Sequence, residues 1–350
     1  MTAVDALGTV TKIRHRLGSR RRVVTLCLVL MLAVTFALAL YLGDYPVAPA
    51  DVIQSLFSPL TGAVNKGVDF IVLNVRLPRA ILAILTGMAF GLAGIIFQTL
   101  LRNPLASPDI IGISHGASAS AVFCIIVLGL TGFAVSLGAL LGAIATALVI
   151  YALAWRNGVT AYRVVLIGIG MAAIMAAIMS YLFTRARLNE VQTALAWLIG
   201  SLNAANYNEI LPLAIATVVL IPATTILARA LDALQLGDDT ATALGARLEV
   251  TRLGLLLAGV AFAAFATAAS GPVTFVAFVA GPIARGLLAG SGKGFVQAAL
   301  VGAWVMLGAD LLAQHALPAI QLPVGVVTGV FGALFLLWLL IASNRAGRVN

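Results

Sequence analysis

Long apolar runs alternate with short polar segments along almost the whole chain. Ten of these runs approach the roughly 20 residues that an α-helix needs to cross a bilayer, and they lack the two-residue alternation of barrel strands. The ten expected spans are 23–42, 80–100, 112–130, 133–154, 163–183, 209–229, 252–269, 273–289, 295–313 and 323–342. The pattern therefore predicts an all-α polytopic membrane protein with about ten transmembrane helices, because helices satisfy their own backbone polar groups in lipid.

The composition indicates that lipid surrounds most of the chain. Of its 350 residues, 62% are hydrophobic and 9% are charged, whereas soluble domains carry about 25% charged residues. The apolar runs leave no room for a separate soluble domain. We expect a basic N-terminal segment (1–22), one transmembrane domain (23–342) whose longest inner loop is about 230–251, and a short tail (343–350).

The positive charges are distributed unevenly between alternate loops. With a cytoplasmic N-terminus, ten spans place 16 of the 21 Lys and Arg residues on the inside. The outside holds Lys66, Arg76, Arg79, Arg185 and Arg187. The positive-inside rule therefore favours cytoplasmic N- and C-termini, and the net charge of +9 needs no nucleic-acid partner.

The N-terminus also has the basic-then-apolar order of a signal peptide. The apolar run Val23–Leu42 is 20 residues long, which is enough to span a bilayer, and no small-x-small cleavage site closes it. We interpret this run as an uncleaved first transmembrane helix.

The residues that usually bind metals are scattered along the chain. Cys27 and Cys124 lie inside apolar runs without a CxxC neighbour, and the three histidines, His15, His115 and His315, are far apart. We therefore predict no metal site and no disulfide framework.

The segment GSGKG (290–294) partly matches a phosphate-binding loop. The pattern GxxxxGK[ST] would require Gly at position 287 and Ser or Thr at position 294, where this chain has Leu287 and Gly294. No nucleophile with a plausible base is evident either. We expect no cofactor and no enzymatic activity on this chain.

Three ionisable residues stand out near the expected outer surface. Arg76 and Arg79 bracket the motif RLPR, either as helix-end anchors or as contacts for an anionic partner. Asp310 lies inside the ninth span, where a charge costs about 2.5–3.5 kcal/mol on insertion scales. A proton-coupled carrier would use such a carboxylate, but a structural Asp hydrogen-bonded to a neighbour is the interpretation that we favour, because relays use several ionisable groups.

The segment RNPLASPDIIGISHGAS (102–118) interrupts the apolar pattern after the second span. Pro104 disfavours helix at Asn103, and Ser107 followed by Pro108 is typical of a new helix start. We expect a break on the inner face, followed by a helix that begins near Ser107. Irregular backbone at this depth is tolerated where it lines a cavity.

Two loops and three glycine pairs complete the pattern. The outer stretch PADVIQSLFSPL predicts a short interfacial helix, and the inner loop 230–251 predicts two short helices broken at Gly237. The glycines four residues apart are Gly87 and Gly91, Gly138 and Gly142, and Gly325 and Gly329. We expect them to pack helices tightly within the chain rather than to form a dimer motif.

Four segments together resemble the iron-siderophore and cobalamin type permease subunits of bacterial ABC importers. They are RLPRAILAILTGMAFGLAGIIFQTLLRNPLASPDIIGISHGAS (76–118), LQLGDDTATALGARL (234–248), SGPVTFVAFVAGPIARGL (270–287) and ADLLAQHALPAIQLPVGVVTGVFGALFLLWLL (309–340). The resemblance covers nearly the whole chain. It implies a ten-helix subunit in the inner membrane that pairs with a second permease subunit, two ATPase subunits that hold the ATP and Mg²⁺, and a periplasmic or lipid-anchored substrate-binding protein.

The resemblance also implies roles for individual residues. Arg76 and Arg79 would meet carboxylates of the binding protein, and Asn103 and Leu105 would belong to the cytoplasmic gate. The coupling helices that enter the ATPases would include Gly237, Asp238, Leu244 and Gly245. Ser114 and His115 are candidates for the substrate pathway, although a helix-packing role suits His115 as well.

The chain departs from the family pattern at three places. Gln314 stands where members often have Arg, and Gln321 stands where they often have Glu, so a third salt contact to the binding protein is not expected. Gly281-Pro282 replaces the common Pro-His or Pro-Gln. This variant is similar to subunits of ferric catecholate or citrate systems, which are heterodimers. The predicted cargo is therefore a ferric siderophore, with haem or cobalamin, a proton-coupled carrier and a structural scaffold as alternatives.

Overall fold

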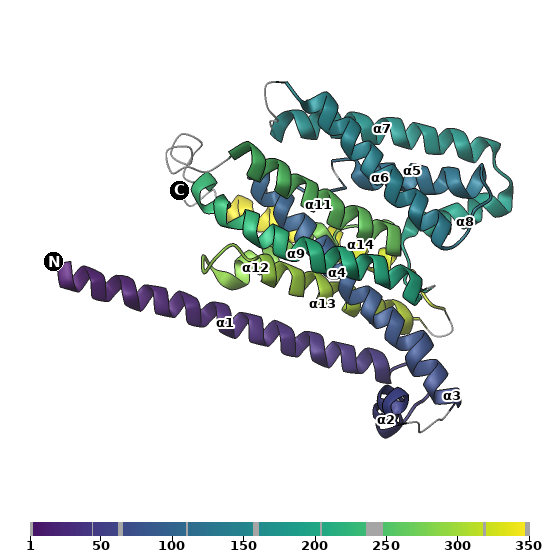
Figure 1. Cartoon of the computed structure of the whole chain (residues 1–350), viewed down its shortest axis with the longest axis horizontal. Helices are drawn as coiled ribbons and strands as arrows, with labels where there is room; N and C mark the ends of the chain where they lie inside the picture. The colour runs from purple at the N-terminus through teal and green to yellow at the C-terminus, as the bar shows by residue number, and fades with distance from the viewer. Residues whose placement is uncertain are drawn as a thin grey trace.

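The computed structural model describes residues 3–43, 45–61, 66–109, 111–156, 161–203, 205–235, 248–317 and 320–346, and this part of the chain is almost entirely helical (Figure 1). The helices are α1 (Ala3–Tyr41), α2 (Pro49–Thr61), α3 (Lys66–Asp69), η1 (Phe70–Arg76), α4 (Leu77–Leu100), α5 (Ile113–Ile126), α6 (Phe133–Ala154), α7 (Ala161–Arg185), α8 (Leu188–Ile199), α9 (Tyr207–Gln235), α11 (Leu248–Ser270), α12 (Val276–Leu288), α13 (Phe295–His315) and α14 (Val324–Ala346).

The predicted pattern of spans is confirmed. Within the described residues, seven helical segments are long and apolar enough to cross a membrane: 15–41, 66–100, 133–154, 162–185, 207–228, 249–270 and 295–315. Three shorter apolar helices, 113–126, 276–288 and 324–339, fall on the remaining predicted runs. The chain is therefore a multi-pass membrane protein.

Two short helices lie outside the spans. The interfacial helix expected in PADVIQSLFSPL is α2, whereas α8 was not predicted. Glu190 reaches back to the Arg187 backbone N–H at 2.9 Å, and Gly200 ends α8 with φ 78°. These are ordinary helix-start and helix-stop signals, but the prediction followed hydropathy and overlooked them.

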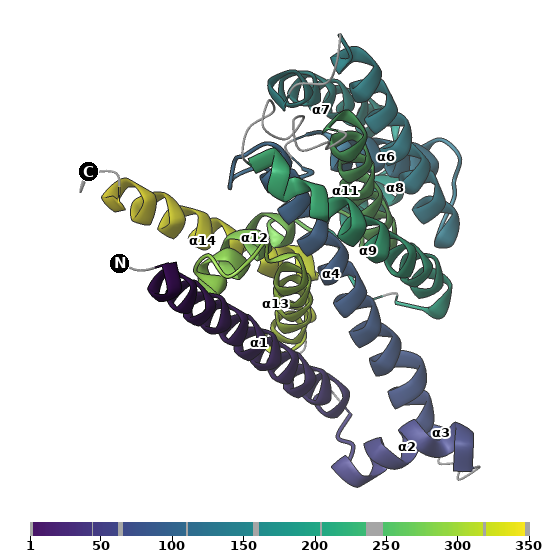
Figure 2. The ribbon, with the colours of Figure 1, turned by 60° about the vertical axis from the view of Figure 1, so that its left-hand side comes forward.

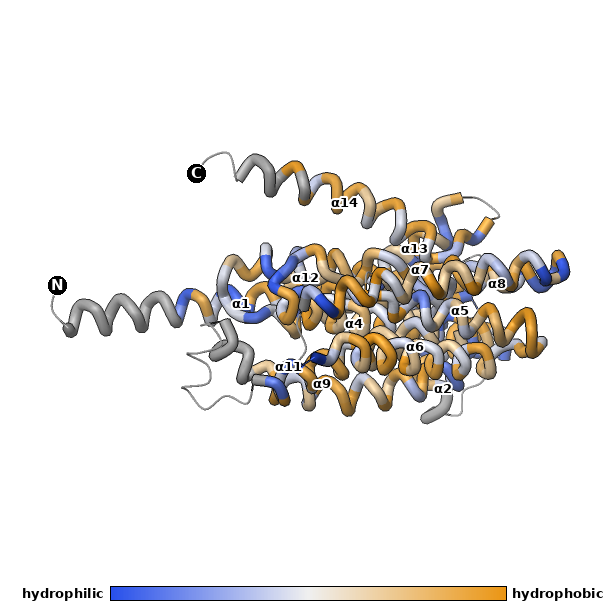
Figure 3. The backbone as a smooth tube through the Cα atoms, turned by 90° about the horizontal axis from the view of Figure 1, so that it is seen from above, coloured by the Kyte–Doolittle hydropathy of each residue, from blue (hydrophilic) through white to orange (hydrophobic). Residues whose placement is uncertain are grey.

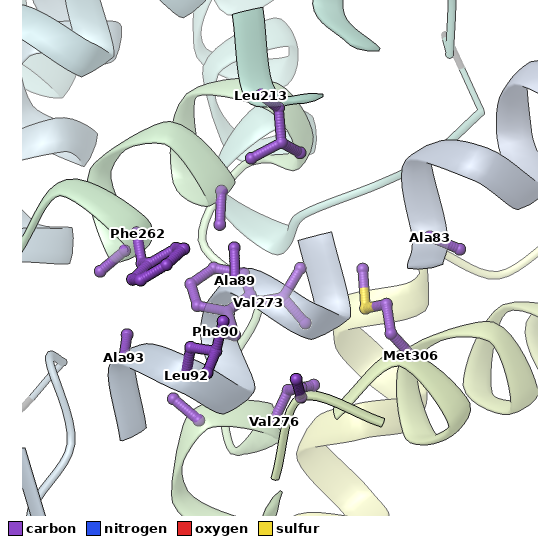
Figure 4. Packing of buried hydrophobic residues seen from close by; sticks show 14 of the residues in the cluster. Ala83, Ala89, Phe90, Leu92, Ala93, Leu213, Phe262, Val273, Val276 and Met306 are labelled. Carbon is purple, nitrogen blue, oxygen red and sulfur yellow. The ribbon is translucent and has the colours of Figure 1, made fainter. Parts of the chain in front are cut away.

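The helices form two packed groups that share α11. In the first group, α4 lies among α9, α11, α12 and α13. Figure 4 shows Phe90 of this group beside Phe262 of α11 and Val276 of α12. In the second group, α5, α6, α7 and α8 pack together, and α11 contacts α5 and α6 (Figures 1 and 2).

Glycines bring the helix backbones close together within the chain. A Cβ added at Gly87 would overlap the carbonyl oxygen of Gly302 on α13, and one at Gly142 would overlap Ser120 on α5. A Cβ at Gly325 would overlap the Ile199 carbonyl at the end of α8. Each of the three glycine pairs therefore has at least one glycine at a close contact between helices, and the expected packing role within the chain is confirmed.

The start of α1 and the end of α14 lie on the same side of the bundle. Both are on the left in Figure 2. Figure 3 shows the apolar residues in the middle of the bundle and hydrophilic residues near its ends. The basic part of α1 contacts the end of α12, where Arg20 Nε donates to the Leu287 carbonyl at 3.0 Å.

Candidate functional site

A buried ion pair joins α4 to α13 near the start of α4. Arg79 Nε donates to Asp310 Oδ2 at 2.9 Å, and Arg79 Nη2 donates to Asp310 Oδ1 at 2.9 Å. The side chains are 11% and 2% exposed, respectively. This two-pronged geometry suits a guanidinium and a carboxylate. The structural interpretation of Asp310 is supported, because its charge is matched within the chain.

Two glutamines complete this network. Gln314, one turn after Asp310, donates to Asp310 Oδ2 at 2.8 Å, and Arg79 Nη1 donates to Gln321 Oε1 at 3.3 Å. In the sequence these glutamines are two separate departures from the family pattern. The structure brings both of them to the same ion pair.

Arg76 makes a second set of contacts at the same end of the bundle. It is 8% exposed and belongs to η1, a π-helix that continues into α4. Its Nη1 donates to the carbonyls of Leu40 and Tyr41 at 2.8 and 2.9 Å, and its Nη2 donates to that of Tyr45 at 2.5 Å. A cation at the C-terminus of α1 is favourable, because the last carbonyls of a helix lack internal donors.

Arg76 and Arg79 are thus neighbours in space as well as in sequence, and both guanidinium groups contact groups of this chain. The docking role that the resemblance implies for them stays a prediction. The pairing of the Asp310 carboxylate with Arg79 agrees with a structural role for Asp310 and gives no support to the proton-carrier alternative.

The predicted break after α4 is present, but the next helix starts later than expected. Residues 101–109 and 111–112 are not helical and include several turns, and α5 begins at Ile113 after Gly112, which has φ 84°. The expected helix start at Ser107 is therefore wrong. Gly112 adopts the left-handed conformation that glycine tolerates, and a Cβ there would lie 2.7 Å from the Gly168 carbonyl oxygen of α7.

The break is organised around Asn103. Its backbone N–H donates to the Gln98 carbonyl at 3.1 Å, and its Oδ1 accepts the Leu105 N–H at 2.9 Å. Its own carbonyl accepts the Ala106 N–H at 3.1 Å. An Asn side chain that bonds two residues ahead stabilises a turn, so Asn103 holds Leu105 in a defined position.

Asp109 lies behind this turn and contacts the first turn of α5. Ser114 Oγ donates to Asp109 Oδ1 at 2.5 Å. Burial raises the pKa of the Asp109 carboxyl, while the Ser114 hydroxyl and the nearby His115 act in the opposite direction. His115 Nδ1 is buried and has no hydrogen-bond partner among the described residues.

A pocket of about 260 Å³ opens beside the break. The described residues that line it are Leu101, Asn103, Leu105, Ala106, Ser107, Ile111, Tyr162 and Val165. The two sequence-predicted gate residues therefore face one cavity, and Ser114 and His115 are not among its described lining residues. Helix α4 separates this pocket from Arg79 by roughly 30 Å at 1.5 Å per residue, which is about the thickness of a bilayer core.

The predicted coupling residues Gly237, Asp238, Leu244 and Gly245 lie outside the described residues. The described part of the chain contains no group of three or more His, Cys, Asp or Glu residues that could hold a metal ion.

The comparisons with known proteins agree along almost the full length of the chain. The profile of the FecCD transport family matches residues 31–342. The chain belongs to the FecCD transport family. This FecCD-family chain is 40% identical over 292 residues to the ferric enterobactin transport system permease protein FepG of Escherichia coli (strain K12), covering 83% of this chain and 88% of FepG.

Two further relatives match over a similar length. The achromobactin transport system permease protein CbrC of Dickeya dadantii (strain 3937) is 38% identical, covering 92% of each chain. The iron(3+)-hydroxamate import system permease protein FhuG of Bacillus subtilis (strain 168) is 36% identical, covering 90% of this chain and 95% of FhuG.

A solved structure has the same fold as this FecCD-family chain. It is described as a metal-chelate type ABC transporter in an inward-facing conformation, and it superposes with a TM-score of 0.77. The match covers 91% of this chain and 98% of the solved chain at 23% sequence identity.

Proposed function

We propose that this chain is the membrane-spanning permease subunit of a binding-protein-dependent ABC importer that carries a ferric siderophore across the inner membrane. The near full-length match to permease proteins of ferric enterobactin, achromobactin and iron(3+)-hydroxamate systems carries this proposal. The family profile runs from residue 31 to residue 342 and therefore extends far beyond one motif, which supports the same transport role.

The positions of the two polar clusters support alternating access. The pocket lined by Asn103 and Leu105 lies at the end of α4 near the cationic loops that we assign to the cytoplasm. The Arg79–Asp310 pair lies at the opposite end. We assign the gate to the former and the binding-protein surface to the end that carries Arg76 and Arg79.

The remaining partners follow from this assignment. A second, related permease subunit would complete the translocation path, and a heterodimer is the form that we propose. Two ATPase subunits would bind ATP and Mg²⁺ and grip the loop containing Gly237, Asp238, Leu244 and Gly245. Both termini of this chain would lie in the cytoplasm.

Reconstitution with these partners tests the proposal. The chain, a second permease subunit and the ATPases are placed in proteoliposomes, and uptake of ⁵⁵Fe-labelled catecholate, hydroxamate and citrate chelates is measured with the binding protein and ATP. We expect ATP-dependent uptake of at least one ferric chelate. Uptake of haem or cobalamin with no ferric chelate transported would reassign the cargo.

Two controls separate the importer from a proton-coupled carrier. Dissipating the proton gradient should leave uptake unchanged, and disabling the ATPase subunits should abolish it. Uptake that stops with the gradient and continues without ATP hydrolysis would contradict the proposed mechanism. A structural scaffold predicts neither uptake nor copurification with the ATPases.

A further inference from the structure

A proline lies in the middle of α12, in the Gly281-Pro282 pair that departs from the family pattern. In an α-helix the N–H of each residue donates to the carbonyl four residues earlier, and proline has no N–H. The carbonyl of Phe278 therefore loses its helical donor at Pro282. Nevertheless, α12 is continuous from Val276 to Leu288.

A side chain from another helix replaces the missing donor. Nε2 of Gln98, on α4, donates to the Phe278 carbonyl oxygen at 3.0 Å and lies 3.5 Å from that of Ala277. Gln98 is 3% exposed, so water does not readily reach this carbonyl. An unpaired buried carbonyl destabilises the folded state, and the Gln98 amide removes that penalty by donating to the Phe278 carbonyl.

Two further residues of α12 match the Gln98 amide. Arg285 Nη2 donates to Gln98 Oε1 at 2.6 Å, which determines which end of the amide faces the Phe278 carbonyl. A Cβ added at Gly281 would overlap Gln98 Oε1. Gly281 therefore leaves space for the Gln98 amide, Pro282 leaves a carbonyl that needs its N–H donor, and Arg285 fixes its orientation.

Gln98 also contacts the break that follows α4. Its backbone carbonyl accepts the N–H of Asn103 at 3.1 Å. One residue therefore connects the proline-containing helix, through its side chain, to the turn that holds the gate residues, through its backbone.

We propose that Gln98 is a positioning residue that replaces the hydrogen bond lost at Pro282 and keeps α12 in register with the Asn103 turn. The replaced hydrogen bond is independent of the proposed function. Its consequence for transport rests on the proposed function: α12 and the gate segment would move as one unit when the ATPases drive the transporter.

A double-mutant cycle in the assembled transporter tests the hydrogen bond. Gln98→Leu should lower the apparent melting temperature by roughly 3–6 °C, because the Phe278 carbonyl loses its donor. Pro282→Ala restores a backbone N–H at position 282. In the Pro282→Ala background, Gln98→Leu should lower the melting temperature clearly less than it does in the unaltered protein. Gln98→Leu also removes the contact with Arg285, but it does so in both backgrounds, so this contribution cancels in the comparison. An equal loss in both backgrounds would overturn the proposal.

Gln297→Leu is the matched control, since Gln297 is 2% exposed and its amide donates to Thr25 Oγ1 at 2.7 Å instead of to a proline-orphaned carbonyl. Gln297→Leu should lower the melting temperature by the same amount with and without Pro282→Ala. Should Pro282→Ala fail to fold, Gly281→Ala gives a second test. The added Cβ should displace the Gln98 amide, so combining Gly281→Ala with Gln98→Leu should lower the melting temperature little more than one substitution alone. Losses that add fully in the double variant would count against the proposal.

The transport consequence has its own measurement. Gln98→Leu should reduce uptake more than ATP hydrolysis, so that several-fold more ATP is used per chelate, and Pro282→Ala should partly restore this ratio. If Gln98→Leu leaves the ATP used per chelate unchanged while Pro282→Ala still rescues its melting temperature, the proposed link to the gate is overturned. The proposed hydrogen bond to the Phe278 carbonyl would still stand. Absence of ATP-driven uptake by the unaltered transporter would contradict the proposed function instead.

Discussion

Arg79 on α4 and Asp310 on α13 form an ion pair between residues that are 231 positions apart, with N–O distances of 2.9 Å at both prongs. Asp310 is nearly fully buried, and Gln314 donates a further hydrogen bond to its carboxylate. Removing one partner of such a pair costs more than removing both, because the remaining charge stays in a poorly solvated place.

Asp310→Ala should therefore destabilise the protein by about 3 kcal/mol, because Arg79 loses its carboxylate. The double variant Arg79→Met with Asp310→Leu should recover most of that loss. Thermal unfolding of the purified transporter measures both changes. Equal stability of Asp310→Ala and the unaltered protein would contradict a structural role for this pair.

Exchanging the charges of Arg79 and Asp310 distinguishes a role of the pair in stability from a role of Arg79 in docking. Arg79→Asp with Asp310→Arg keeps an ion pair but inverts its orientation, so it should fold better than either single variant. If Arg79 also meets a carboxylate of the binding protein, docking to the proteoliposomes should weaken in the exchanged variant. Unchanged docking would remove Arg79 from the proposed docking surface.

Arg76 should respond to a substitution at a neighbouring glycine. A Cβ at Gly43 would lie 2.5 Å from Arg76 Nη2, so Gly43→Ala should displace the guanidinium from the end of α1. We expect a loss of about 2 kcal/mol from the weakened charge-assisted hydrogen bonds. Gly67→Ala is the control, since a Cβ there meets nothing within 4 Å. Equal effects of both alanines on the melting temperature would argue against this contact.

Gly87→Ala should separate α4 from α13. The added Cβ would meet the backbone of Gly302, which cannot move aside as a flexible side chain can, and overpacking of this kind costs about 1–3 kcal/mol. Gly170→Ala, within α7, has open space around the new Cβ and should raise stability by up to about 1 kcal/mol, because alanine favours helix more than glycine does. The melting temperatures of the two variants check this, and a neutral Gly87→Ala would show that the two helices tolerate separation.

Asp109 should make the stability depend on pH. Burial raises the pKa of its carboxyl in the folded protein, so the folded state holds a proton that the unfolded state releases. Stability should therefore fall as the pH rises from the ordinary Asp pKa to the raised value, and then level off. Asp109→Asn keeps an acceptor for Ser114 and should flatten that part of the profile. Parallel profiles of the melting temperature against pH for both proteins would contradict this.

Asn103→Ala should loosen the gate. It removes the 2.9 Å bond to the Leu105 N–H, so we expect chelate to leak from loaded proteoliposomes without ATP. Asn206→Ala is the matched control, because Asn206 Oδ1 accepts the Asn208 N–H at 2.9 Å in a similar turn at the other end of the bundle. Leak from both variants, or from neither, would speak against a gate at Asn103.

The order of helices could be predicted closely because it depends on local properties. Span 133–154 coincides with α6, and the run 295–313 lies within α13. Helix α8 and the start of α5 were harder to predict. Helix α8 depends on a capping contact at Glu190, and the start of α5 depends on the close approach of Gly112 to α7. The second of these belongs to tertiary packing, which hydropathy does not describe.

By itself the sequence determined the membrane environment, the number of apolar helices and the break at Asn103, because each follows from the composition of a short stretch. Only the tertiary structure decided that Arg79 meets Asp310 and that Gln98 meets the Phe278 carbonyl. Such pairs depend on how each helix is rotated and how closely it approaches its neighbour. Backbone contacts at glycines such as Gly87 set that approach, and they join residues that are far apart in the chain.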